Sequence, residues 1–166
     1  TDAVLDRLRP LLESLELPKL GYDLKRVGHL LANHNIALRA VRSDVLIQSY
    51  VLNSVMRHGL EDLCRSYLEL TPIDPETLLG KGRSKKQFSD LAPDAVLEYS
   101  AQKIDYSWRL AALLAHELNR AGQLAEVYRY FEQPLVETLR QIERNGIRLD
   151  SSLLEKQSEE LAQQLE

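Results

Sequence analysis

The feature that most constrains the fold is a helical spacing of apolar residues, interrupted at short intervals by proline and glycine. At the start of the chain, Val4, Leu5, Leu8 and Leu11 recur at steps of three and four, as in an amphipathic helix. Proline and glycine then end or divide the helices. Helices are expected at residues 3–17, 24–33, 44–53, 60–70, 74–79, 93–100, 102–120, 125–132, 134–143 and 151–166. At most three short strands are expected, at residues 19–22, 35–41 and 147–149, so the chain is predicted to be predominantly α-helical with few short strands.

The composition is that of an ordinary globular chain and argues against several classes of protein. The net charge is −4, so any surface for nucleic acid must be local. No apolar run approaches the roughly 18 residues of a membrane span, and charged residues interrupt any signal-peptide pattern in residues 1–16. Cys64 is the single cysteine, which favours a reducing, cytoplasmic compartment, and its helical spacing indicates a buried thiol. The four histidines show no metal-ligand spacing.

Residues 134–150 hold the most specific local pattern. Pro134 suits the first turn of a helix, where its missing N–H costs nothing, and Asn145-Gly146 suits the end of that helix, because glycine accepts a left-handed backbone. Residues 147–149 then lead to Asp150, an expected cap for a further helix. The segment resembles a signature of the family A DNA polymerases, of the bacterial DNA polymerase I type. In that family this stretch leaves the 3′–5′ exonuclease domain and enters the polymerase domain at the thumb.

The resemblance covers essentially the whole chain. It is carried by residues 31–39, Asp44, residues 48–54, Gly80-Lys81-Gly82 followed by Phe88, and Tyr99-Ser100-Ala101. It implies a truncated exonuclease-like domain at residues 1–121, connecting helices and a turn at residues 122–150, and the start of a thumb helix at residues 151–166. It also implies an α/β, RNase H-like fold whose leading strands are missing here. The parent would be a DNA-directed DNA polymerase of replication and repair that uses Mg²⁺ and binds DNA.

The family's exonuclease holds two divalent metal ions with carboxylates from three motifs. The first motif, Asp-x-Glu, is expected before Thr1. The second follows Lys19-Leu20-Gly21, and the gapless register places Asp23 on the family's Asn and Val27 on its metal-binding Asp. A rival register places Tyr22-Asp23 on the aromatic-Asp ending of the motif, but it requires a four-residue shift. In the gapless register Val27 cannot bind a metal and is expected to pack in the core.

The third motif, Tyr-x-x-x-Asp, begins at Tyr99 but has Lys103 where the acid belongs. An ammonium group there would repel Mg²⁺. Asp105 lies two positions further on, roughly 200° around a helix, and so does not simply replace the acid. The resemblance therefore implies a vestigial domain with no catalytic or metal-binding residue of its own and no cofactor in this fragment. Asp23, Asp44 and Asp105 are then expected to be helix caps or surface residues.

A basic loop is the remaining candidate site. Its four cations, without an intervening acid, are Lys81, Arg83, Lys85 and Lys86. Such a loop suits sequence-independent contact with DNA phosphates, although a solvated loop without a partner has the same composition. Trp108 has helical spacing and is expected in the core rather than as a platform for stacked bases.

Three functions remain open from the sequence. In the first, the domain is an inactive scaffold in the cytoplasm of a bacterium, at the nucleoid, with DNA as a partner through the parent polymerase. In the second, the longer parent is an active two-metal exonuclease with Asp23 and Asp105 as displaced ligands. In the third, the chain is a DNA-binding fragment that acts through the basic loop. Because the leading strands are missing, exposed apolar helix faces also predict self-association.

Overall fold

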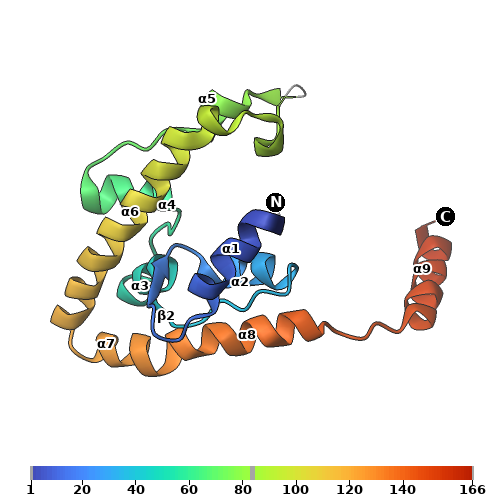
Figure 1. The fold of residues 1–166 in the computed structure, drawn as a ribbon. Helices are drawn as coiled ribbons and strands as arrows, with labels where there is room; N and C mark the ends of the chain where they lie inside the picture. Colours follow the sequence, from blue (N-terminus) through green and yellow to red (C-terminus); the bar gives the residue numbers. More distant parts are fainter. Residues whose placement is uncertain (1, 83–84, 166) are drawn as a thin grey trace.

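Two helices enclose the N-terminal part of the fold. The structure is a computed structural model that describes residues 2–82 and 85–165. One of the two helices is α6 (Pro93–Arg120) and the other is α8 (Gln133–Asn145). A corner made of α7 (Gln123–Val127) and the π-helical turn η4 (Tyr128–Glu132) joins them. Figure 1 shows the N-terminal elements nested in the angle between the two helices. This arrangement places one side of the N-terminal region against α6 and another side against α8.

The N-terminal region is built around a parallel pair of short strands. Its elements are α1 (Asp2–Glu13), β1 (Lys19–Gly21), α2 (Leu24–Ala32), β2 (Val41–Asp44) and α3 (Val45–Leu52). Leu20 pairs with Ser43 and Gly21 with Asp44, and α2 is the crossover that parallel neighbours require. The register brings the ends of both strands, and therefore the starts of α2 and α3, to one place.

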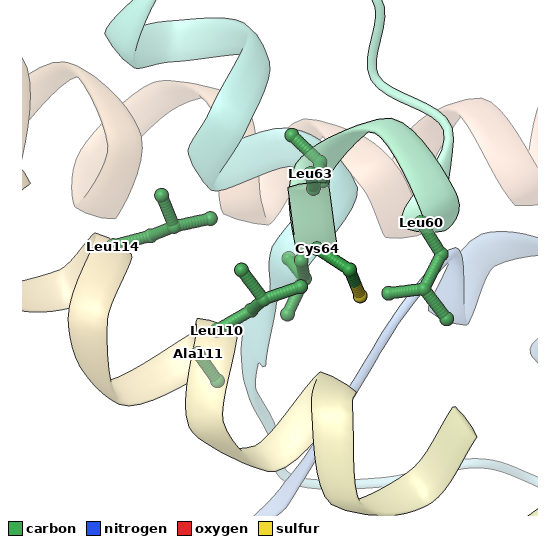
Figure 2. Close-up of a cluster of buried hydrophobic side chains, with 7 residues drawn as sticks. Leu60, Leu63, Cys64, Leu110, Ala111 and Leu114 are labelled. Atoms are coloured by element: carbon green, nitrogen blue, oxygen red, sulfur yellow. The ribbon is translucent and has the colours of Figure 1, made fainter. Parts of the chain in front are cut away.

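The core lies where α3 and α6 meet α4 (Leu60–Leu63) and the π-helical turn η1 (Cys64–Leu68). Figure 2 shows this cluster, which consists of Val45, Leu60, Leu63, Cys64, Leu110, Ala111 and Leu114. Leu63, Leu110 and Leu114 are fully buried. Their burial anchors the middle of α6 against the N-terminal region, since each such side chain contributes about 1.5–3 kcal/mol.

The remaining elements lie further from this core. They are α5 (Pro75–Leu79), the 3₁₀ turn η3 (Phe88–Asp90) and the C-terminal helix α9 (Ser151–Leu165). An extended link at residues 146–150 separates α9 from α8, and α9 lies apart from the other elements in Figure 1. Every residue of α9 is exposed.

The expectation of a predominantly helical chain with few short strands is confirmed, and several details differ from it. The described residues contain two strands, and residues 147–149 are not one of them. The second strand begins at Val41 rather than before it. Residues 93–120 form one continuous helix, because no residue in that stretch interrupts the backbone ladder. Trp108 was expected in the core, but its side chain is 64% exposed, since it projects from α6 beside a groove.

Candidate metal site between α2 and α6

The second and third motif positions line one groove, which we call the α2–α6 groove. It has a volume of about 660 Å³ and runs between β1 and α2 on one side and α6 on the other. Val27 lines one wall, and Lys103 and Trp108 line the other. Val27 is therefore a half-buried groove residue, not the core residue expected from the sequence. The fold brings together the two positions where the sequence resemblance expects metal-binding acids.

Asp23 also lines the α2–α6 groove, and its position follows from its role as the N-cap of α2. Its backbone is left-handed (φ 54°), and its carboxylate accepts a hydrogen bond from the Arg26 N–H at 3.4 Å. Asp44 lies directly behind it and is 1% exposed. The Asp44 carboxylate accepts from the N–H groups of Asp23 (3.0 Å), Leu24 (2.7 Å) and Leu46 (3.0 Å). Both acids are therefore caps, although Asp44 is buried rather than on the surface.

Burial and hydrogen bonding act in opposite directions on the Asp44 carboxyl. Removal from water raises its pKa above the ordinary value, and the three backbone N–H groups pull it down. Burial is the larger of the two effects, so the pKa of the carboxyl lies above its ordinary value. Each carboxylate oxygen of Asp44 already accepts at least one hydrogen bond from a backbone N–H. The role of this carboxylate is therefore to cap α3 and to bind the start of α2.

Lys103 is held by its neighbours at the third motif position. Its Nζ donates to the Tyr99 hydroxyl at 3.1 Å and lies 4.0 Å from Glu61 Oε1. Tyr99 is 9% exposed, and the Phe88 ring stacks on it with 5.4 Å between ring centroids. Tyr99 is therefore a packed aromatic residue of the fold. Asp105 pairs with Arg109 at 2.9 Å and does not line the α2–α6 groove.

The donor set of the α2–α6 groove does not fit a pair of divalent metal ions. Asp23 is the only acid among the described residues that line it, which also include the cations Lys19, Arg26 and Lys103. Within the described part of the chain, no three His, Cys, Asp or Glu side chains are grouped to hold a metal. Hard divalent cations need several oxygen ligands, and an ammonium 4 Å from such an ion repels it by about 2 kcal/mol even at the dielectric constant of water.

The basic loop is partly described. Lys81 pairs with Glu76 at 2.9 Å, and Lys85 and Lys86 are exposed. Arg83 lies outside the described residues. The Lys86 N–H donates to the Leu79 carbonyl at 2.8 Å, and the stacked Phe88 follows two residues later. Contact between this loop and DNA stays a prediction.

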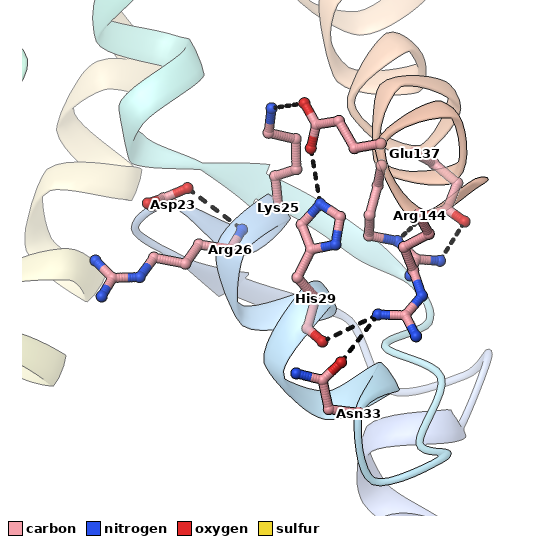
Figure 3. Close-up of polar contacts among 9 residues, drawn as sticks. Asp23, Lys25, Arg26, His29, Asn33, Glu137 and Arg144 are labelled. Carbon is pink, nitrogen blue, oxygen red and sulfur yellow. Dashed lines mark hydrogen bonds and ion pairs between the residues drawn. The ribbon is translucent and has the colours of Figure 1, made fainter. Parts of the chain in front are cut away.

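A polar network that sequence reasoning missed joins α2 to α8. Glu143 accepts from Lys25 Nζ at 2.6 Å and contacts His29 Nε2 at 2.7 Å. Arg144 donates to the Asn33 side chain at 3.2 Å. Figure 3 shows Lys25 and His29 of α2 on the side that faces α8, and Arg144 of α8 reaching toward Asn33 at the end of α2. The partners are more than 100 residues apart in sequence, so no local pattern could have paired them.

Known DNA polymerases are similar to this chain over nearly its whole length. The 3′–5′ exonuclease domain of DNA polymerase A matches residues 1–119. DNA polymerase I of Pseudomonas aeruginosa is 39% identical over 99% of this chain and 18% of its own length. DNA polymerase I of Rhizobium leguminosarum is 34% identical over 96% of this chain and 16% of its own. A solved structure, the POL domain of Pol1 from M. smegmatis in complex with DNA primer-template and dNTP, superposes with a TM-score of 0.75 and 25% sequence identity. The match covers 99% of this chain and 25% of the length of that structure.

The chain belongs to the 3′–5′ exonuclease family of the family A DNA polymerases. This confirms the resemblance drawn from the motifs and from residues 134–150. The chain spans less than a fifth of the length of these two curated relatives. Across residues 2–82 and 85–165, no helix is both long and apolar enough to cross a membrane.

Proposed function

We propose that this chain is the exonuclease-like segment of a bacterial-type DNA polymerase and that it acts there as a scaffold without nuclease activity. The observation that carries the proposal is the pair Val27 and Lys103 on the two walls of the α2–α6 groove. A valine offers no ligand, and the lysine places a positive charge where a metal ion would need a negative one. The parent would extend DNA primers on a template with Mg²⁺, in the bacterial cytoplasm at the nucleoid.

In this proposal residues 1–121 are the exonuclease-like part, residues 122–150 connect it to the polymerase, and residues 151–166 begin the thumb. The buried contacts of α6 with α3 and α4 support a scaffold role, because they keep a defined fold without help from a metal site. The network between α2 and α8 supports it further, since it fixes the connecting helix against the domain.

The test is an exonuclease assay on the longest natural polypeptide that contains these residues. The substrate is a 5′-labelled primer with a mispaired 3′ end, with Mg²⁺ or Mn²⁺ and without nucleotides. We expect no metal-dependent shortening, and we expect extension of a paired primer once nucleotides are added. An active 3′–5′ exonuclease on the same substrate is the positive control.

The competing reading makes Asp23 and Asp105 displaced metal ligands. Metal-dependent shortening that Asp23→Ala or Asp105→Ala abolishes would overturn the proposal. Asp74→Ala is the matched control, because Asp74 is also an N-cap aspartate but belongs to α5, away from the α2–α6 groove. Any shortening should be unaffected by that control.

A further inference from the structure

A second groove, on the other side of α2, carries a concentration of positive charge unusual for a chain with net charge −4. It has a volume of about 680 Å³ and lies between α2, residues 37–42 and α8. It adjoins a depression of about 330 Å³, and Arg42, Arg129 and Gln133 line both. We call the two together the arginine groove. Neither Val27 nor Lys103 lines it.

Among the residues that the structure describes, five cations and one acid line the arginine groove. The cations are Lys25, Arg39, Arg42, Arg129 and Arg140, and the acid is Glu137. Two of the cations are already neutralised, because Lys25 pairs with Glu143 at 2.6 Å and Arg140 with Glu137 at 2.6 Å.

The other three cations are available to a ligand. Arg39, Arg42 and Arg129 are exposed, and their guanidinium groups form no hydrogen bond or ion pair with any other described residue. Because Glu137 is already paired with Arg140, Arg39, Arg42 and Arg129 repel one another, and an anion would relieve that repulsion.

The smaller depression adds a buried polar group. Gln48 is 2% exposed and lines it. Its Nε2 donates to the Ala111 carbonyl at 3.4 Å, but its Oε1 has no partner in the part of the chain that the structure describes. Buried acceptors are usually satisfied, so the unsatisfied Gln48 amide makes the wall of the smaller depression polar.

We propose that the arginine groove binds a phosphate group, carried by a nucleotide or by a nucleic-acid strand. The planar guanidinium fork matches phosphate oxygens in pairs, which favours phosphate over other anions. Arg42 and Arg129 hold the phosphate where the two depressions meet, and Gln48 faces the remainder of a nucleotide. Arg39 extends the positive surface along the larger depression, where a strand would continue.

The test is an NMR titration of this chain at low salt with four probes: inorganic phosphate, deoxyadenosine monophosphate, a hexathymidine oligonucleotide and hexaglutamate. We expect the first three to shift the side-chain Nε–H signals of Arg42 and Arg129. The nucleotide is expected to shift the Gln48 amide signals as well. If the source is a strand, the oligonucleotide binds more tightly than the nucleotide, and its log affinity falls against log salt with a slope of roughly −2 for three contacts.

Two double variants distinguish binding at the arginine groove from attraction to positive charge elsewhere on the protein surface. Arg42→Gln/Arg129→Gln should weaken binding of the three phosphate probes roughly tenfold or more, since each arginine supplies a charge-assisted bond. Arg7→Gln/Arg57→Gln removes the same charge from exposed positions outside the arginine groove and should leave binding within twofold. Each variant is checked by its thermal transition.

Three results would overturn this proposal: no shift with any phosphate probe, equal loss of binding in both double variants, or hexaglutamate binding as tight as that of the oligonucleotide. The last result would mean an acidic peptide site. Loss of this proposal would leave the proposed scaffold function standing, because the two rest on different residues.

Discussion

At the scale of single residues, Asp44 connects several elements of the fold through its hydrogen bonds. Its carboxylate accepts three backbone N–H groups, two at the start of α2 and one in α3. Its own N–H donates to the Tyr128 hydroxyl at 3.0 Å, which connects it to η4. One buried carboxylate therefore fixes the junction of both strands with the two helices that follow them.

Replacing Asp44 with alanine should lower the free energy of unfolding by about 3 kcal/mol, because it leaves three N–H groups without their acceptor. Urea unfolding followed by circular dichroism measures this loss. Asp74→Ala is the matched control, since that exposed N-cap accepts one N–H at 2.9 Å and should cost about 1 kcal/mol. Equal losses in the two variants would show that Asp44 is an ordinary cap.

Cys64 provides a second residue-scale prediction. Its side chain is fully buried, and burial raises the pKa of the thiol to about 11. The thiolate is the reactive form, so the folded protein at pH 8 should react with an aromatic disulfide reagent only as fast as it unfolds. In urea above the unfolding transition, the reaction should be complete within the mixing time of a manual assay. Rapid labelling of the folded chain would mean that the core around Cys64 opens locally.

At the scale of elements, the sequence predicts the first residues of helices more accurately than it predicts which helix faces are buried. Asp44 and Pro134 mark helix starts through local chemistry, and the structure places them there. Trp108 shares the helical spacing of buried residues, yet it lies beside the α2–α6 groove. Spacing identifies a face of a helix, but only the tertiary arrangement decides whether another element covers it. The convergence of Val27 and Lys103 on one groove depends on that arrangement as well.

The contact between α2 and α8 gives the next prediction. A Cβ added at Gly28 would lie 2.9 Å from Arg140 Cδ, so Gly28→Ala must displace a side chain that is paired with Glu137. Overpacking costs about 1–3 kcal/mol, which exceeds the gain of roughly 0.5–1 kcal/mol for alanine over glycine in a helix. We expect Gly28→Ala to destabilise the chain.

The same substitution should stabilise a chain that already carries Arg140→Ala, because the close contact is then absent. The four variants of a double-mutant cycle, measured by urea unfolding, give this change of sign directly. If Gly28→Ala has the same effect in both backgrounds, α8 does not pack closely on α2 in solution.

At the scale of the whole molecule, stability is expected to be uneven. Leu110 and Leu114 of α6 are fully buried, whereas every residue of α9 is exposed. The apolar side chains of α9 include Leu153, Leu154 and Leu161, each more than half exposed. A lone helix of this length is marginal in water, so α9 should depend on contacts that a longer chain or a second copy supplies.

Hydrogen exchange tests this difference. In a dilute sample, the amides of α9 should exchange nearly as fast as an unfolded peptide, and those around Leu110 and Leu114 only through global unfolding. Raising the protein concentration separates the two possible sources of support. Protection of α9 that increases with concentration would confirm the predicted self-association through its exposed leucines. Protection that stays low at all concentrations would contradict self-association through α9. Strong protection of α9 in dilute solution would contradict the separation of α9 from the rest of the fold.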